Sequence, residues 1–406
     1  MSRRILVITP FAPSPQGRHG SVRVIDGLLR ALAERHELVV LHLQDEGAID
    51  PDLAARCVAV HALPVAPLGG FTRRAVDVAA LLRGRSMWAG ELGLRRVGRQ
   101  ARALAIELRP HVVQVEHGVL GEALSAAGPD AIRIVTIHDP AASRLEFVPL
   151  RRAGLLTHRL DAWAALREER RVLSLADAAV VFSERDRRGL AQGSRPARAE
   201  LVTIPLGWEV PPAALDPDGA EPQTLLFVGN FIHPPNVAAA RTLARAILPR
   251  VRQLRPDVRL EIVGNSPPPE VMALASDAVL VTGTVASVAP HLNRAAAVVA
   301  PLTIGGGTRV KVLEALAAGK AVVASTRAAE GISARAGEEL IVADGETATA
   351  AAIVRLLEDR SARRELGARA RAWALRELSF AGMAARYEEL YERAARRRND
   401  ASRSRP

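Results

Sequence analysis

The first half of the chain alternates short runs of valine, isoleucine and leucine with longer segments of helical periodicity. Ile5–Thr9 and Leu38–Leu43 are typical of buried strands, and Val22–Glu34, which lies between them, is typical of a helix. Strands that are apolar on both faces and separated by helices indicate a parallel sheet covered on both sides. Further strands are predicted at 112–115, 132–137 and 178–182, and a long amphipathic helix at 155–175.

This alternation stops at Glu209–Gln223, which reads EVPPAALDPDGAEPQ and contains four prolines. A proline-rich segment without periodicity is typical of a linker. The fold class predicted is therefore α/β, with two Rossmann-like, doubly wound domains at 1–208 and 224–379 joined by the linker 209–223. In the second domain, strands are predicted at 225–228, 260–263, 279–282, 297–300 and 321–324.

The two predicted domains also indicate where a ligand would bind. Ligands of open α/β sheets lie beyond the carboxyl ends of the strands, so we expect the site in the cleft between the domains. A last helix is predicted from Phe380 to Arg398, and we expect the basic tail that ends it to be disordered.

Composition limits the class of protein. With 49% apolar and 24% charged residues in 406, the chain is globular and long enough for two domains. Its single cysteine, Cys57, excludes an intrachain disulfide and a cysteine-based zinc cluster, and it favours a reducing compartment. No apolar run approaches the ~20 residues that span a bilayer, and the start lacks the long apolar region of a signal peptide. We therefore expect a cytoplasmic protein.

The net charge of +11 is unevenly distributed. Residues 71–109 contain nine arginines and three acidic residues, hence a net charge of +6. Phe71 and Trp88 lie in the same segment, and arginine with interfacial aromatic residues suits an anionic membrane surface. A solvated helical face is the alternative interpretation. Nucleic acid is disfavoured as a partner, because aromatic residues make up only 3% of the chain and no recognised binding motif occurs.

The segment Ala300–Ser325, APLTIGGGTRVKVLEALAAGKAVVAS, carries the clearest chemistry. Three glycines at 305–307 allow the backbone to approach a ligand, Thr308 is a predicted helix N-cap, and Gly319 is predicted to end the helix. A glycine-rich turn before a helix N-terminus is a ready anion site. Arg309 and Lys311 in the first turn oppose the helix dipole unless an anion lies between them, which indicates a functional site.

Within this segment, Leu313–Val323 resembles the donor-binding signature of the family 4 retaining glycosyltransferases, also called glycosyl transferases group 1. The fold that this resemblance implies is GT-B, two Rossmann-like domains facing across a cleft, and it implies that the last helix packs back on the first domain. The commonest form of the signature has a glutamate eight positions before Glu314, where this chain has Gly306. The chain instead matches the branch of the family that reads Gly-Gly-Gly-Thr-Arg-x-Lys.

The resemblance assigns donor-binding roles residue by residue. It implies that Glu314 binds the nucleotide ribose, or pairs with Lys311 one turn earlier. It also implies that backbone amides and basic groups at the helix start hold the diphosphate, with Arg309 and Lys311 replacing the basic pair that many relatives carry after the first strand of this domain. The predicted donor-binding residues are Gly20, Gly229, Asn230, Gly264, Val285, Gly306, Gly307, Thr308, Arg309, Lys311 and Glu314.

Three residues are predicted to be catalytic. His138 follows a strand at the expected cleft edge, where the family often places a histidine near the reacting sugar, and Glu116–His117 is a weaker candidate of the same kind. Arg309 and Lys311 would stabilise the charge that develops on the leaving diphosphate. No metal-ligand spacing occurs, so we expect no metal and no cofactor besides a nucleotide diphosphate sugar as co-substrate. No nucleophilic carboxylate is evident, which is consistent with retention by attack on the same face.

The sequence thus predicts a metal-independent, retaining glycosyltransferase of hexosyltransferase type. The expected acceptor is a glycan or lipid-linked molecule of cell-surface polysaccharide or glycolipid synthesis, with peripheral attachment to the inner face of the cell membrane as a further expectation. Two alternatives stay open, a nucleotide-sugar 2-epimerase and a non-catalytic GT-B scaffold or sugar-nucleotide sensor. A dinucleotide-dependent oxidoreductase is disfavoured, because no Gly-x-Gly-x-x-Gly follows a strand.

Overall fold

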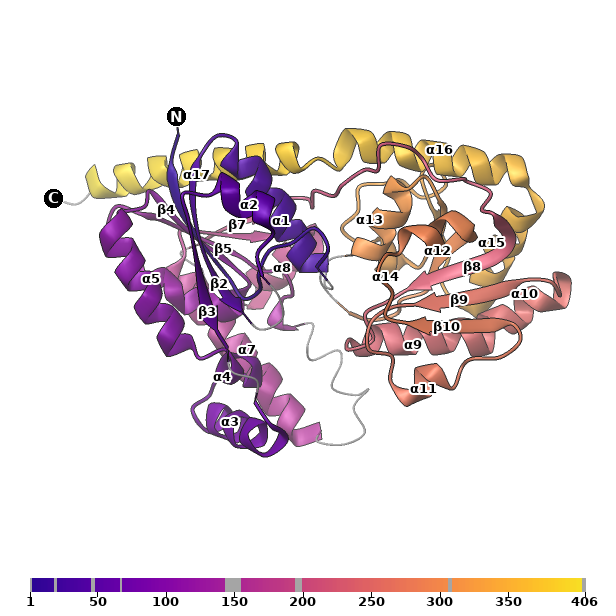
Figure 1. The fold of residues 1–406 in the computed structure, drawn as a ribbon, viewed down its shortest axis with the longest axis horizontal. Coiled ribbons are helices and arrows are strands. Elements are labelled where there is room, and N and C mark those ends of the chain that lie inside the picture. The colour runs from indigo at the N-terminus through magenta and orange to yellow at the C-terminus, as the bar shows by residue number, and fades with distance from the viewer. Residues whose placement is uncertain are drawn as a thin grey trace. The chain divides into compact units, whose positions relative to one another are not determined.

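The protein folds into two compact units in a computed structural model that describes residues 2–17, 20–44, 48–65, 68–142, 155–193, 199–305 and 309–403. The described residues of the first unit run to Gly207 and resume at Phe380, whereas those of the second are Trp208–Gly305 and Arg309–Ser379. The last helix therefore belongs to the first unit (Figure 1). Each unit is a parallel sheet with its own helices, and the predicted strands and helices of both are present.

The first unit contains a seven-stranded parallel sheet of order β3-β2-β1-β4-β5-β6-β7. The strand order reverses between β1 and β4, where Ile8 pairs with Val115, as in a doubly wound fold. The inner strands β1, β2, β4, β5 and β6 are rich in apolar residues and mostly buried, which is why their sequences lack alternation, whereas the edge strands β3 and β7 are only partly buried. The strands are β1 Arg4–Thr9, β2 Glu37–Gln44, β3 Ala59–Pro64, β4 Val112–Glu116, β5 Ile132–Thr136, β6 Ala178–Val181 and β7 Glu200–Thr203.

Helices cover the first sheet, and α1 and α17 lie side by side (Figure 1). A 3₁₀ helix, Gly118–Ala126, contacts α5 and α7 and joins them to a buried apolar core. The helices of this unit are α1 Gly20–Ala33, α2 Pro51–Arg56, α3 Gly70–Leu82, α4 Met87–Glu91, α5 Leu94–Leu108, α7 Leu155–Leu175, α8 Glu184–Gly193 and α17 Phe380–Arg403.

Helix α17 is held firmly by the first unit. A Cβ atom at Gly27 or Gly207 would come within 2.2 Å or 2.7 Å of the Phe380 ring, so both positions admit the ring only as glycine. At the other end, Arg398 donates to Asp177 Oδ2 at 2.7 Å and to the Ala131 carbonyl at 2.6 Å. The expected disorder after Arg398 is therefore wrong for the described part of the tail, because the helix continues to Arg403.

The second unit contains a six-stranded parallel sheet of order β10-β9-β8-β11-β12-β13, whose order reverses between β8 and β11. Strand β8 begins at Glu221, inside the segment predicted to be linker. Its strands are β8 Glu221–Val228, β9 Arg259–Val263, β10 Val279–Gly283, β11 Ala295–Ala300, β12 Ala321–Ala324 and β13 Ile341–Val342. Its helices are α9 Pro234–Thr242, α10 Leu248–Leu254, α11 Pro269–Met272, α12 Ala289–Arg294, α13 Val310–Ala317, α14 Thr326–Ala329, α15 Glu346–Glu358 and α16 Arg360–Glu377, with a π-helix Leu243–Ile247 between α9 and α10.

The described helices also bear on membrane topology. None of them combines the length and the apolar character that crossing a bilayer requires.

Candidate functional site

The second unit brings strand ends together at one edge of its sheet. Gly229 follows β8, and its amide donates to the Val263 carbonyl at the end of β9 at 2.9 Å. Gly264 has φ +154°, and a Cβ there would lie 1.7 Å from the Gly229 carbonyl oxygen. Only glycine at 264 allows the two backbones to come this close. Both glycines are predicted donor-binding residues, and the structure places them side by side.

Hydrogen bonds extend this edge to β10 and to the loop after β8. The Gly264 amide donates to the Gly283 carbonyl at 3.1 Å, and Phe231 donates to the Asn265 carbonyl at 2.9 Å. The Asn265 side chain accepts from Thr284 Oγ1 at 2.9 Å. The half-buried Val285 follows Thr284 in the chain. Asn265 thus orders the strand-end loops, a role that only the folded arrangement reveals.

Lys311, near the start of α13, is tied to the loop that follows β8. Its Nζ donates to Asn236 Oδ1, while Asn236 Nδ2 donates to the Asn230 carbonyl at 2.6 Å. The same ammonium lies 4.6 Å from the centroid of the Phe227 ring. Asn236 and Phe227 are not among the predicted site residues. Asn236 lies in the segment His233–Val237 after β8, and nothing in the sequence spacing shows that it reaches Lys311.

The electrostatic surroundings of Lys311 are unusual for a lysine. Burial, together with the nearby positive charge of Arg309, lowers its pKa to about 7. Its hydrogen-bond and ring partners among the described residues are neutral, and no described carboxylate lies within ion-pair distance. A phosphate oxygen would supply the missing negative charge and favour the charged amine.

Arg309 occupies the N-cap position of α13, where the sequence predicted Thr308. Its guanidinium is nearly buried and donates to the Gly305 carbonyl at 2.6 Å and to the Arg327 carbonyl at 3.0 Å. These carbonyl dipoles offset the positive charge at the helix N-terminus. Arg309 therefore braces the glycine loop from within. The predicted residues Gly306, Gly307 and Thr308 lie outside the described residues.

The remainder of α13 positions Glu314. Val312, Leu313 and Leu316 are buried, and Glu314 is half-buried one turn after Lys311. After the helix, Gly319 has φ +75° and its amide donates to Leu316, while the following amide donates to Ala315. This glycine-terminated end confirms the predicted stop of the helix and sets its length.

The first unit holds a second polar cluster, built on β4, β5 and α17. His138 Nε2 lies 2.8 Å from Glu116 Oε2, and both side chains are buried. Glu116 Oε1 accepts from Gln114 Nε2 at 2.7 Å and from Thr136 Oγ1 at 3.0 Å. Tyr387 of α17 lies 2.9 Å from Thr136 Oγ1. Two sequence candidates, His138 and Glu116, are thus direct partners.

The other ring nitrogen of His138 is placed differently. Nδ1 is buried and has no hydrogen-bond partner among the described residues. The ring stacks on His117 with centroids 4.0 Å apart, and Phe182 meets its edge at 4.9 Å. An imidazole held by a carboxylate at one nitrogen, with the other nitrogen unengaged, is suited to hydrogen bonding or proton transfer with a ligand.

Gly20, the last of the predicted donor-binding residues, lies in the first unit. Gly20 is the first residue of α1 and is half-buried, and the neighbouring residues 18–19 are not described. Gly20 and His138 belong to the first unit, and the other described site residues belong to the second. Among the described residues, no group of three histidine, cysteine or acidic side chains is placed to hold a metal ion.

Part of the chain matches the model of a known protein family. Residues 222–359, about a third of the chain, match the family Glycosyl transferases group 1. No curated protein matches the chain in sequence. The matched segment contains the strand-end glycines, Asn236, Lys311 and Glu314.

Solved structures resemble the whole chain. Sucrose-phosphate synthase from Thermosynechococcus elongatus has a TM-score of 0.72 at 18% identity, covering 96% of this chain and 99% of its own. HepE of Anabaena in complex with UDP and glucose has a TM-score of 0.68 at 15% identity with the same coverage. TarM has a TM-score of 0.68 at 9% identity, again with the same coverage. These likenesses show that the fold is GT-B, as predicted.

Proposed function

We propose that the protein is a retaining glycosyltransferase that takes a sugar from a nucleotide diphosphate donor. The observation that carries the proposal is Lys311, a half-buried ammonium that contacts an amide oxygen and an aromatic ring among the described residues, in the segment that matches group 1 glycosyl transferases. A cation in this setting is stabilised by a bound anion. The diphosphate of a nucleotide sugar supplies that anion.

The other described residues of this edge suit the rest of such a donor. Gly229 and Gly264 pack their backbones closely at the strand ends and leave no side chain there, and Glu314 lies one turn beyond Lys311 to accept hydrogen bonds from ribose hydroxyls. Arg309 acts by holding Gly305 in place rather than by spanning to a phosphate. As the diphosphate leaves, Lys311 and the α13 N-terminus stabilise its charge, and no step of this mechanism requires a metal.

We assign His138 to the reacting end of the sugar. Its Nδ1 is buried and has no hydrogen-bond partner in the part of the chain that the structure describes, and Glu116 fixes the ring through Nε2. The nitrogen can hydrogen-bond a donor or acceptor hydroxyl without moving the ring. The acceptor is a glycan or a lipid-linked molecule of cell-surface polysaccharide or glycolipid synthesis, and the site of action is the cytoplasm.

Calorimetry with a panel of UDP, GDP and ADP sugars tests the proposal. Lys311→Met should weaken the binding of the selected nucleotide sugar by about a hundredfold, as loss of a charge-assisted contact does, while leaving that of the bare nucleoside unchanged. Glu314→Ala should weaken the binding of both the nucleotide sugar and the bare nucleoside. Lys320→Met is the matched control, since Lys320 is the only other lysine and Nζ there donates to the Asp216 carbonyl.

Three outcomes would count against parts of the proposal. If no nucleotide sugar binds the native protein, the donor site itself is refuted. If a nucleotide sugar binds but is neither hydrolysed nor transferred, the protein is a sugar-nucleotide sensor with a GT-B fold. Conversion of the donor to its 2-epimer would instead show an isomerase. The anomeric configuration of the released sugar, followed by NMR, tests retention.

A further inference from the structure

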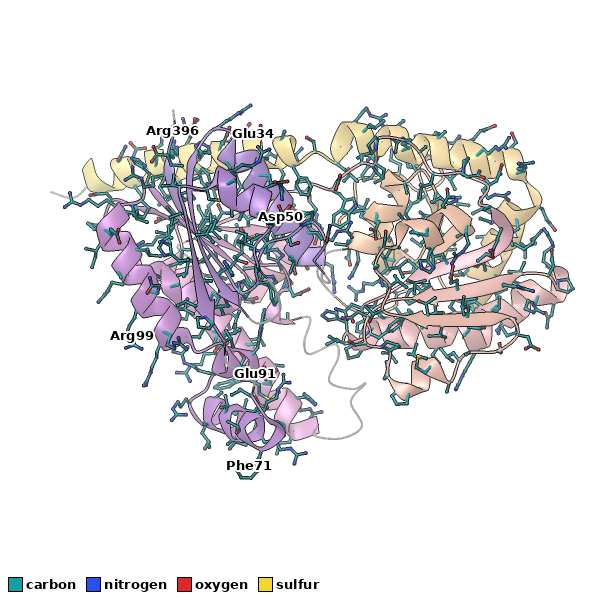
Figure 2. The ribbon with its side chains drawn as sticks, in the orientation of Figure 1. Glu34, Asp50, Phe71, Glu91, Arg99 and Arg396 are labelled. Carbon is teal, nitrogen blue, oxygen red and sulfur yellow. The ribbon has the colours of Figure 1, made fainter. Side chains whose placement is uncertain are left out.

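Helix α3 exposes three large apolar side chains along one stripe. Phe71 is 89% exposed, Leu82 is 84% exposed, and Val78 between them is 57% exposed. Their spacings of seven and four residues place them on one face of a helix. Figure 2 labels Phe71 at an extremity of the first unit, beyond the body of the sheet. A stripe of this kind on an ordered helix calls for a partner surface.

Helix α7 carries a second stripe of the same kind. Leu156, Leu160 and Trp163 are exposed, and their spacings of four and three residues again place them on one helix face. The two helices contact each other, and the first turns of α7 lie beside α3 in Figure 1. We call the six apolar residues of the two stripes the α3–α7 surface.

Hydrogen bonds fix α7 to the start of α4 and to Ala141. Ser86, at the start of α4, donates through Oγ to Glu168 of α7 at 2.7 Å, and the Met87 amide donates to Asp161 at 2.7 Å. Glu169 accepts from the Ala141 amide at 2.7 Å. The acidic side chains of α7 are thus engaged by neighbouring donors.

Positive charge surrounds the apolar stripes. Arg74 is exposed one turn after Phe71, and Arg159 is exposed one turn after Leu156. Arg167 lies over the Trp163 ring, 5.9 Å from its centroid. Apolar side chains flanked by arginines fit the boundary of an anionic bilayer, where the rings and aliphatic groups enter the headgroup region and the guanidinium groups meet lipid phosphates.

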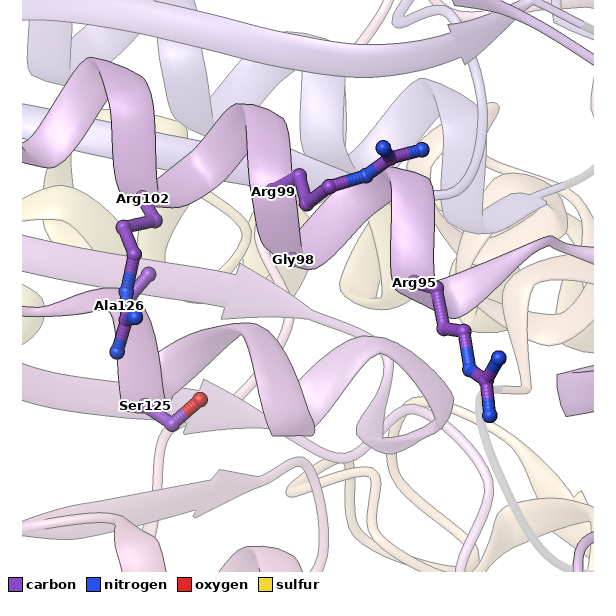
Figure 3. Close-up of a pocket in the computed structure, with 6 residues that line it drawn as sticks. All are labelled: Arg95, Gly98, Arg99, Arg102, Ser125 and Ala126. Atoms are coloured by element: carbon purple, nitrogen blue, oxygen red, sulfur yellow. The ribbon is translucent and has the colours of Figure 1, made fainter.

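The structure reassigns the residues that the sequence suggested for such a contact. Trp88 is half-buried and packs between Phe11 and His117, with ring centroids 6.3 Å and 5.6 Å away. It is therefore unavailable to a membrane. Three arginines of α5 line a separate hollow with Ser125 and Ala126 (Figure 3); they are Arg95, Arg99 and Arg102. Their positive charges would attract an anionic membrane at long range without inserting apolar groups into it.

We propose that the α3–α7 surface docks the protein on an anionic phospholipid membrane. Charge complementarity selects this occupant, because a second copy of a chain of net charge +11 would bring like charges together. The inference deepens the proposed function, since docking would bring the transferase to a lipid-linked acceptor, and it rests on that function only for the acceptor.

Vesicle flotation of the full chain tests the docking. The protein should float with phosphatidylcholine vesicles that contain 30 mol% phosphatidylglycerol at low salt, and much less with phosphatidylcholine alone or at high salt. Phe71→Ser with Leu82→Ser should lower partitioning by about tenfold. Arg74→Gln with Arg159→Gln should lower it by about twenty-five-fold, or about fivefold for each arginine.

Leu375→Ser with Arg376→Gln is the matched control, because both residues are exposed on α16 of the second unit; this variant should float like the native protein. Equal flotation of all variants, or none of the native protein at low salt, would overturn the proposal. A fall from dimer to monomer for Phe71→Ser in analytical ultracentrifugation would show instead a contact between copies. Donor calorimetry on the same samples separates failure of docking from failure of donor binding.

Discussion

Two charged clusters of the second unit differ in whether the buried charge has an opposite charge beside it. In the first, the buried carboxylate of Asp218 is paired with arginines: Arg360 donates to it at 2.7 Å and the buried Arg363 at 3.1 Å. Around Lys311 the partners among the described residues are an amide oxygen and an aromatic ring. A buried charge with its counter-charge present holds the chain together, whereas one that lacks it is prepared for a ligand.

The two lysines of the chain show the same contrast: Lys311 lies in the first turn of α13, and Lys320 follows the end of this helix. Lys320 is fully buried, and the acidic groups of Asp216 and Asp218 offset part of the burial that lowers its pKa to about 8. Lys311 has no such offset, and its pKa falls to about 7. Composition alone does not distinguish the two residues. Their surroundings do.

The largest expected effect comes from breaking the complete cluster. Asp218→Asn should lower the free energy of unfolding by about 3 kcal/mol, because it leaves the buried Arg363 without its carboxylate. Denaturant titration of the full chain measures this loss. Glu365→Gln, which removes an exposed pair with Arg369, should change it by less than about 0.5 kcal/mol. Similar losses for both variants would contradict the structural role of Asp218.

A smaller effect is expected from the polar cluster of the first unit. There the Glu116 carboxylate is hydrogen-bonded, whereas His138 Nδ1 has no hydrogen-bond partner among the described residues. Glu116→Gln should reverse the hydrogen bond to His138 Nε2 and place the ring proton on Nδ1. The rate constant for donor hydrolysis should fall by about ten- to a hundredfold, with the pH profile shifted and donor affinity unchanged.

Thr136→Val provides the control for that variant. It removes the hydrogen bonds of Thr136 Oγ1 with Tyr387 and with Glu116 Oε1, but it leaves the pair between Glu116 Oε2 and His138 and the hydrogen bond from Gln114 in place. It should therefore lower stability while keeping the native pH profile. If both variants keep the native profile, Glu116 supports the fold and does not position His138.

The smallest effect sharpens the picture of Lys311 through pH. Because its pKa is about 7 in the free protein, a bound diphosphate should raise it, and binding should take up a proton at pH 8. Nucleotide-sugar affinity should therefore fall by up to about tenfold per pH unit above 7. Calorimetry in buffers of different ionisation enthalpy measures the uptake, which Lys311→Met should abolish. A flat profile in the native protein would contradict the role of Lys311.

The same pKa gives a stability prediction of opposite sign. Between pH 7 and the ordinary value of 10.5, the unfolded chain binds a proton at Lys311 that the folded chain does not. The contribution of Lys311 to the free energy of unfolding therefore increases as pH rises through this window. Lys311→Met should remove this increase, and Lys311 thus makes folding less favourable at neutral pH in exchange for anion binding.

The sequence by itself determined the two doubly wound sheets, because uninterrupted apolar runs form strands only where both faces are buried. It also indicated the glycine loop and α13, since Gly319 and the apolar spacing act within a few residues. The placing of Lys311 and Glu314 one turn apart on this helix follows from the same local spacing, whereas their roles in donor binding stay predictions. Local chemistry is visible along the chain.

Only the tertiary structure decided which distant groups meet. Asn236 reaches Lys311 across 75 positions, and Tyr387 reaches Thr136 across 251, because parallel strands and a returning helix bring their ends together. The tertiary structure also directs the Arg309 guanidinium toward carbonyls, packs the half-buried Trp88 between Phe11 and His117, and leaves Phe71 exposed. A residue's burial and partners depend on contacts far away in sequence, and those contacts decide whether its charge is satisfied or left for a ligand.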